Sequence, residues 1–447
     1  MLRWSRLFKT FRNALKVKDI RSKLIYTFIA LIIVRLGSFL PVPGVNRDVF
    51  QSFISGQTGM GFLSTLTGGS FERMSLFALN IGPYITASII IQLLTIVFPK
   101  LEEMQKDGEE GRKKIAEISR YITIGLAILE ASAMLIGFQG YLTDGLNFTN
   151  FVTIVATFTA GSAFLMWYGE RITEKGVGNG ISIILLINIV ADLPSKFTIL
   201  FKNYVFNQSN VMNGILGAVV IIAIVLVMLV LILLLQDGER RIPVQYAKKV
   251  QGRKMVGGQT SSIPIKVNTA GVIPVIFAGS FMQFPIIIAS FFKVHGARAS
   301  FGEKILYLLN QQNWCNFKDF GEFKYSLGLL IYIALVIFFA YFYTSITFNP
   351  IEVADNMKKQ GGFIPGIRPG KPTTDYLTKV LNHIILIGAI GLTIVAVIPI
   401  FFSGAFSVTE VSFGGTSLII VVGVVLETMK QIESQLLVRH YKGFLND

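Results

Sequence analysis

The sequence predicts an all-α, polytopic membrane protein with ten transmembrane helices, and three observations lead to that fold class. Of the 447 residues, 52% are apolar and only 15% are charged, whereas soluble domains are usually about 25% charged. The mean hydropathy is +0.60. Apolar runs of membrane-spanning length recur along the chain, and basic residues gather in alternate connections between them. A lipid-facing exterior explains all three.

The apolar runs give the number of spans. A spanning helix needs roughly 20 mostly apolar residues. Eight runs meet that length: 24–40, 76–98, 121–138, 151–168, 214–235, 270–292, 327–348 and 381–402. Two shorter runs, 181–193 and 416–429, are ambiguous by length, and counting both as spans gives ten.

The distribution of Lys and Arg sets the orientation. With the N-terminus inside, 31 of the 41 basic residues fall in cytoplasmic segments and 9 fall outside, as the positive-inside rule requires. The cytoplasmic segments are then 1–23, 99–120, 170–180, 237–266, 349–379 and 430–447. Dropping one short span would put the two ends on opposite sides and spoil this bias. Both termini are therefore expected in the cytoplasm, in a multi-pass protein.

The two short spans predict an internal repeat. They are the fifth and the tenth, and each follows a glycine-rich turn, at Gly178-Asn179-Gly180 and at Gly414-Gly415. Short or glycine-interrupted spans at matching positions of two halves point to a pathway at their interface. We therefore expect two inverted five-helix halves, 21–200 and 212–430, followed by a cytoplasmic tail at 431–447.

The first 20 residues are basic and amphipathic, with no cleavable signal peptide. Residues 1–20 are predicted to form a surface helix at the cytoplasmic face of the membrane. A solvated basic tail is the alternative.

The chemistry of the spans excludes several classes of function. Ionisable groups are sparse, with Glu130 lying inside the third span, whereas ion-coupled transporters usually place such groups deep in the membrane. The lone Cys315 and three scattered histidines form no metal-ligand pattern. Nothing in the sequence points to catalysis: we find no paired carboxylates and no Ser/His or Ser/Lys pair at membrane depth, and no Walker motif. We expect a non-enzymatic chain without metal or cofactor, whose aliphatic lining blocks ions by dewetting when closed.

Residues 60–74, between the first two spans, are semi-apolar but too short to cross a bilayer. They are broken by Gly68-Gly69 and lie on the outer side. Irregular backbone is tolerated at membrane depth when protein surrounds it, so this segment is predicted to fold back among the spans. An interfacial helix lying on the bilayer is the alternative.

Two cytoplasmic connections, 237–266 and 349–375, are far longer than the 2–8 residues that usually join bundle helices. Alternation across Ile242–Tyr246 is a hairpin-like signal. Arg368 stands at an exposed tip between Ile367 and Pro369. Both connections suit docking to an acidic or RNA-bearing partner, with contact to anionic lipid as the alternative.

Several motifs, in order along the chain, resemble the SecY family, the channel subunits of bacterial-type Sec protein translocases. They are Phe77–Ile85, Gly176–Ser182, Arg240–Lys249, Asn268–Pro274, Phe363–Gly370 and Gly414–Ser417. The resemblance implies that the ten helices surround an hourglass pore. It also implies a protein-conducting function: unfolded secretory polypeptides cross the membrane, and the helices of membrane proteins leave sideways through a lateral gate.

The resemblance also implies roles for individual residues. The pore ring would be Ile81, Ile85, Ile181, Leu185, Ile276 and Ile420. Residues 60–74 would be the plug, with Phe62, Leu63, Leu66, Gly68 and Gly69. The second, third, seventh and eighth spans would form the lateral gate, with Thr86, Gln92 and Phe284 at or near it.

The implied docking residues for a motor or ribosome are Arg240, Arg241, Lys248, Lys249, Arg253 and Arg368. The implied partners are the SecE and SecG subunits, the SecA motor ATPase, the ribosome, signal sequences, unfolded polypeptides and the lipid bilayer. The implied location is the bacterial plasma (inner) membrane. The rival interpretation is an inverted-repeat secondary transporter, which would need a solute- or ion-binding site near the bilayer midplane.

Overall fold

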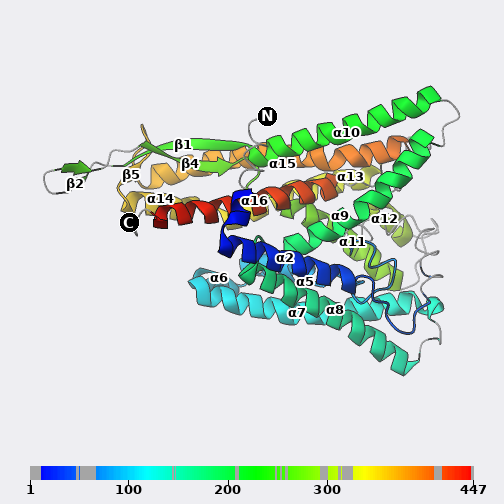
Figure 1. Cartoon of the computed structure of the whole chain (residues 1–447). Helices are drawn as coiled ribbons and strands as arrows, with labels where there is room; N and C mark the ends of the chain where they lie inside the picture. The colour runs from blue at the N-terminus through cyan, green and yellow to red at the C-terminus, as the bar shows by residue number, and fades with distance from the viewer. Residues whose placement is uncertain are drawn as a thin grey trace.

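The computed structural model describes residues 12–46, 50, 67–142, 145, 147–206, 211–246, 249–251, 254–256, 260–291, 301–310, 314, 326–406 and 415–443. In these ranges the chain forms a helical bundle with a small β-sheet projecting from one end (Figure 1). Helices α6 and α14 lie at the end that carries the sheet, and α12 lies at the opposite end.

The N-terminal half of the chain is built from helices alone in the described ranges. They are α2 (Lys18–Gly37), α5 (Gly82–Val97), α6 (Pro99–Lys106), α7 (Gly108–Gly137), the 3₁₀ turn η1 (Gln139–Tyr141), α8 (Phe148–Lys175), α9 (Gly180–Phe201) and the π-helical turn η2 (Lys202–Phe206).

The C-terminal half contains the remaining helices and all the strands described. Its helices are α10 (Val211–Asp237), α11 (Ile273–Phe291), α12 (Phe301–Leu309), α13 (Leu327–Thr347), α14 (Pro350–Lys359), α15 (Lys371–Phe406) and α16 (Gly415–Gly443). Its strands are β1 (Glu239–Tyr246), β2 (Lys249–Gln251), β3 (Lys254–Val256), β4 (Thr260–Lys266) and β5 (Gly362–Phe363).

A helix lies at each of the ten predicted span positions: α2, α5, α7, α8, α9, α10, α11, α13, α15 and α16. Within the described residues, six segments are long and apolar enough to cross a membrane: Gly108–Gly137, Phe148–Lys175, Gly180–Ile199, Gly214–Asp237, Leu327–Lys359 and Lys371–Phe401. A seventh is a pair, α5 with Pro99–Gln105, bent by 108°. In its described ranges the protein is therefore a mostly helical membrane protein with six or seven clearly apolar spans.

Several boundaries differ from the sequence prediction. The second span begins at Gly82 rather than residue 76, because Asn80 has a φ of +51° and Pro83 favours the first turn of a helix. The fifth helix runs for 22 residues and the tenth for 29, so neither is short. Polar residues continue α16 beyond its apolar run, whereas α9 continues through Pro194-Ser195-Lys196 into a further, mostly apolar stretch. The predicted cytoplasmic loop 99–120 is largely helical, in α6 and the start of α7.

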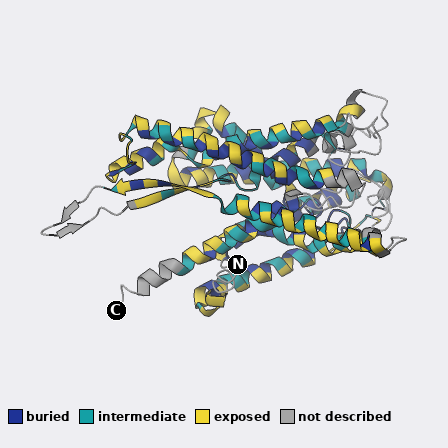
Figure 2. Ribbon diagram, turned by 90° about the horizontal axis from the view of Figure 1, so that it is seen from above, coloured by how far each residue is buried: buried dark blue, intermediate teal, exposed yellow. Residues whose placement is uncertain are grey.

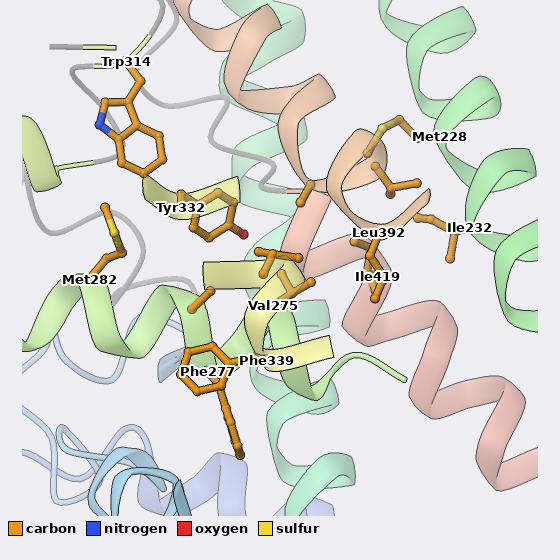
Figure 3. Close-up of a cluster of buried hydrophobic side chains, with 14 of the residues drawn as sticks. Met228, Ile232, Val275, Phe277, Met282, Trp314, Tyr332, Phe339, Leu392 and Ile419 are labelled. Carbon is orange, nitrogen blue, oxygen red and sulfur yellow. The ribbon is translucent and has the colours of Figure 1, made fainter. Parts of the chain in front are cut away.

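Buried aliphatic and aromatic side chains form separate clusters inside the bundle. In one of them Tyr332 of α13 packs beside Trp314, with their ring centroids 5.7 Å apart. Met282 of α11 and Ile232 of α10 belong to the same cluster (Figure 3). The Trp314 Nε1–H donates to the Leu308 carbonyl at 2.7 Å. The outer connection that contains α12 is thus fastened to the bundle by a buried tryptophan.

The exterior is apolar along much of its length, as a lipid-facing surface requires. Exposed and buried residues alternate along the helices, with the buried ones turned inward (Figure 2). Helix α10 exposes a series of large apolar side chains: Met212, Ile215, Leu216, Val219, Ile222, Leu226, Val227, Val230 and Leu234. In water this surface would be an aggregation hazard; in lipid it is matched to its surroundings.

The two halves meet along α9 with α16 and along α7 with α11. The glycine-rich turn between α8 and α9 packs against α16, next to the contact of α9 with α16. The Thr27 hydroxyl of α2 accepts a hydrogen bond from the Val177 amide at 3.1 Å. A Cβ at Gly178 would lie 2.9 Å from the Thr428 hydroxyl of α16. The turn is packed between helices of both halves, which explains its glycines without any nucleotide-binding role.

We expect Gly178→Ala to lower the free energy of unfolding by about 1–3 kcal/mol, the usual cost of a strained backbone position. Gly178 has a φ of +82°, and the added methyl group would also press on Ile183 at 2.8 Å. Thermal unfolding of the purified protein in detergent measures the effect. The matched control is Gly125→Ala in α7, where nothing lies within 4 Å of the added Cβ. Equal midpoints for both variants would contradict the packing argument.

Candidate functional site

The six residues predicted to form the pore ring lie in one hydrophobic cluster, which we call the central cluster. Ile81, Leu185, Ile276 and Ile420 are between 0% and 8% exposed, and Ile85 and Ile181 are partly buried against them. The six side chains come from α5 or its N-cap, from α9, from α11 and from α16. Four helices, two from each half, therefore meet through aliphatic side chains at one place.

Local backbone geometry positions the α5 contribution. The Ile85 amide donates to the Ile81 carbonyl at 3.0 Å, so the two side chains are four residues apart on one face. Ile85 also packs against the Tyr332 cluster. The α9 contribution has the same spacing, and its first turn is capped by the Asn179 Oδ1, which accepts from Ile181 N and Ser182 N. Both pairs thus point inward from well-defined helix starts.

Two buried amides stand beside the central cluster. Asn80 is 3% exposed and Asn188 of α9 is 1% exposed. In the part of the chain that the structure describes, the Asn188 Oδ1 has no hydrogen-bond partner. Burying an oxygen atom without a hydrogen-bond partner costs free energy. We therefore expect Asn188 to have a role in addition to packing. No sequence pattern indicates that Asn188 contacts the segment at Gly68.

The predicted plug is described at its C-terminal end. Gly68 and Gly69 have φ values of +62° and +75°, and Gly68 contacts the Asn188 backbone on α9. The segment therefore does enter the bundle at this point, as expected of irregular backbone that protein surrounds. Phe62, Leu63 and Leu66 lie outside the described residues.

The predicted gate helices are neighbours in the structure. Helix α7 contacts α5 and α11, and α11 contacts α13. Ile89 of α5 shares a buried cluster with Phe277 and Met282 of α11. The Thr86 hydroxyl donates to the Gly82 carbonyl at 3.2 Å, and the Gln92 amide donates to the Ser88 hydroxyl at 3.5 Å. Phe284 lies on α11, but its side chain is outside the described set.

The two long connections form one platform. Strand β1 pairs antiparallel with β4 over seven residue pairs, and the hairpin expected at Ile242–Tyr246 is confirmed. Strand β5, from the other connection, pairs with the opposite edge of β1, at Gln245 with Phe363 and Tyr246 with Gly362. Figure 1 shows this sheet beside the ends of α14 and α15, with the β2–β3 hairpin extending beyond the helices. Sequence reasoning missed this cross-pairing, because two residues in a strand leave too short a pattern to recognise.

A hydrophobic layer fastens the platform to the helices. Ile242 and Val244 point to the same side of β1 and are 1% and 0% exposed. They pack with Met357 of α14 and with Leu377 and Leu381 of α15. The alternating burial along β1 is the half-buried strand pattern. The platform is therefore a fixed part of the C-terminal half.

Three of the predicted docking residues are described with their side chains, and all three lie on the platform or at its tip. Arg240, Arg241 and Arg368 are exposed. The Arg241 Nε lies 2.9 Å from the Glu239 carboxylate, and the Arg368 carbonyl accepts from the Thr373 hydroxyl at 2.9 Å. Lys249 lies in β2 without a described side chain, and Lys248 and Arg253 lie outside the described residues. The platform presents cations to the surroundings.

Comparison with known proteins settles the family. A family model described as SecY matches residues 75–429. The "Protein translocase subunit SecY" of Halalkalibacterium halodurans is 43% identical, with 98% of this chain and 100% of the relative covered. The chain belongs to the SecY family. The subunit of Bacillus subtilis is 42% identical over 99% of this chain and all of the relative. The family and the apolar helices make the chain a multi-pass protein of the bacterial membrane.

Solved structures agree on the fold. A structure described as that of a protein conducting channel matches with a TM-score of 0.64 and 18% identity, covering 93% of this chain and 92% of the other. A second, on a SecY protein whose plug domain is said to stabilise the closed state and maintain a membrane seal, has a TM-score of 0.61 at the same identity and coverage. At such identities the likeness concerns the fold. The SecY-family fold thus holds for nearly the whole chain.

Among the residues that the structure describes, no group of three or more His, Cys, Asp or Glu side chains could hold a metal ion.

We expect Ile242→Ala to destabilise the platform by about 2–4 kcal/mol, within the usual range for replacing a buried isoleucine by alanine. The measurement is hydrogen exchange at the β1 and β4 amides, which should become faster while exchange in the spans is unchanged. Gln245→Ala, at an exposed position of the same strand, is the matched control and should leave exchange as it is. Equal protection in both variants would show that the hydrophobic layer does not hold the sheet.

Proposed function

We propose that this SecY-family chain is the channel-forming subunit of a bacterial protein translocase, passing unfolded polypeptides across the membrane. The observation that carries the proposal is the central cluster, in which four helices meet through six aliphatic side chains. Such a contact excludes ions and water without directional bonds. It separates and closes again around side chains of any kind, which a channel for varied polypeptides needs.

The ten helices are proposed to form two inverted five-helix halves, 21–200 and 212–430, around an hourglass pore. The contact of α9 with α16 supports this arrangement, since these are the fifth helix of each half. Basic residues on one side favour both termini in the cytoplasm, with 1–20 as a surface helix and 431–447 as a tail.

In the proposed mechanism the chain gates passively, and partners supply the energy. A docked partner separates the halves through the platform, and a signal sequence wedges between α5 and α7 on one side and α11 and α13 on the other. The movable part of the plug segment 60–74 then moves aside. Packing of Ile89 against Phe277 and Met282 supports this gate position, because purely apolar contacts part without leaving unpaired polar groups.

The proposed partners follow from the platform and the family. Exposed Arg240, Arg241 and Arg368 suit the SecA motor and the ribosome, whose surfaces are acidic or phosphate-bearing. A solved canine ribosome–channel complex from the endoplasmic reticulum shares the fold, with a TM-score of 0.62, 17% identity and coverage of 93% of this chain and 92% of that one. The apolar outer faces suit SecE, SecG and the bilayer.

The transporter alternative has little to support it. An inverted-repeat transporter needs a solute or ion site near the midplane. The place where the halves meet is instead occupied by isoleucine and leucine side chains, with two buried amides beside them.

Site-specific crosslinking tests the proposed function. A photoreactive probe at Ile81 or Ile276 should crosslink to a stalled secretory polypeptide, because both positions lie in the central cluster. A probe at Ile387, which is 62% exposed on α15, is the control and should crosslink lipid instead. A transporter would give no polypeptide adduct at either cluster position, and that result would refute the channel.

Docking is tested at the platform tip. Arg368→Glu should abolish SecA-driven export while the subunit still assembles, since the reversed charge repels an acidic docking surface. Export is measured in a strain depleted of its own subunit. Lys359→Glu, an exposed charge reversal at the end of α14, should export normally. Normal export by both variants would remove Arg368 from the docking site.

A further inference from the structure

The inference concerns what holds the C-terminal end of the proposed plug, and it rests on the proposed function. The chain before residue 67 lies outside the described set, and the chain after Gly69 is firmly packed. Phe71 makes edge contacts with Phe50 and Phe138 at centroid distances of 5.9 and 6.4 Å. The Val42 amide donates to the Met74 carbonyl at 3.1 Å, and the Leu76 amide donates to the Leu40 carbonyl at 2.9 Å. Any movable part of the plug must therefore end at or before Gly69.

Gly68 is the last point of contact before that boundary. A Cβ there would lie 2.7 Å from the Asn188 carbonyl oxygen of α9 and 3.0 Å from the Arg35 Nη1 of α2. Its φ of +62° also favours glycine. The backbone at Gly68 is thus held closely between two helices, and glycine is required for that approach.

Arg35 makes the polar contact at this point. It is the cation predicted inside the first span, where a charged side chain is costly unless it has a function or a partner. Its Nη1 donates to the Gly68 carbonyl oxygen at 3.3 Å. Its guanidinium carbon lies 5.4 Å from the centroid of the Phe39 ring, within cation–π range. Asp192 of α9 attracts the Arg35 charge.

A second guanidinium, that of Arg73, lies 4.6 Å from the centroid of the same ring. Arg73 belongs to the packed segment after Gly69 and repels Arg35. The repulsion between these two like charges is opposed by the Gly68 contact and by the attraction of Asp192. If the plug moved, Arg35 would lose the Gly68 carbonyl but keep Arg73 beside it.

We propose that Arg35 is a plug-positioning residue that fastens Gly68 between α2 and α9 and so raises the free energy required to displace the plug. The contact is a single hydrogen bond from a charged donor, strong enough to bias the closed state and weak enough to break when a signal sequence enters. Asn188 forms the opposite wall of the contact.

The test is the resting ion conductance of the full-length subunit, assembled with its partner subunits and reconstituted in planar bilayers. Arg35→Gln should raise the conductance roughly tenfold, the change expected on losing a hydrogen bond to a charged group. Arg35→Lys keeps a cationic donor and should raise it less. Lys202→Gln, the loss of an exposed cation at the end of α9, is the matched control and should leave the conductance unchanged.

A deletion of residues 62–70 separates this inference from the proposed function. The deletion should leak, and adding Arg35→Gln to it should change nothing further, because Arg35 acts through the plug. If the deletion variant leaks but Arg35→Gln does not, the inference about Arg35 is overturned, while the assignment of the plug is kept. If the deletion variant does not leak, the assignment of this segment as the plug is wrong. If Arg35→Gln raises the conductance of the deletion variant as much as it raises that of the intact subunit, the inference is also overturned. Arg35 would then act on something other than the plug.

Assembly is checked by co-purification of the partner subunits. If Arg35→Gln does not assemble, Phe39→Leu carries the test, because Phe39 is 52% exposed and its replacement leaves the packed segment intact. A smaller rise in conductance supports the inference, and an unchanged value overturns it.

Discussion

Contact among aliphatic side chains from α5, α9, α11 and α16 is the interaction on which the rest of the molecule depends. Dispersion and the exclusion of water hold these side chains together, and neither requires a fixed partner geometry. A polar junction at the same place would leave unsatisfied groups whenever the helices part. Isoleucine and leucine avoid that cost. The two halves can thus be tightly closed and still separable.

Other features follow from the need to bring these helices together. Glycines at the α8–α9 turn allow close approach of α2, α9 and α16. The bend of 108° between α5 and Pro99–Gln105 redirects the chain before α7 begins. Proline at position 83 and the left-handed backbone at Asn80 start α5 so that Ile81 and Ile85 reach the cluster. Local backbone chemistry thus positions the central contact.

The number and order of helices could be predicted because apolar runs and basic connections reflect lipid and charge directly. The six ring positions came from motifs, and the structure brings them into one cluster; their role in a pore remains a prediction. Three features escaped the sequence. Helices α9 and α16 extend beyond their apolar runs because helix propagation does not require apolar residues. The pairing of β5 with β1 joins segments over a hundred residues apart. The contact of Arg35 with Gly68 depends on a packing distance that no local pattern encodes.

The pairing of β5 with β1 links the two long connections at the end of the bundle that carries the sheet. One strand of the sheet continues from α10 and β4 leads into α11, while β5 lies between α14 and α15. A load applied to either connection is therefore shared by both through backbone hydrogen bonds and the buried layer below. The two connections therefore form one structural unit that is attached to four helices. A force applied to the sheet is therefore passed to α10, α11, α14 and α15 together rather than to one loop.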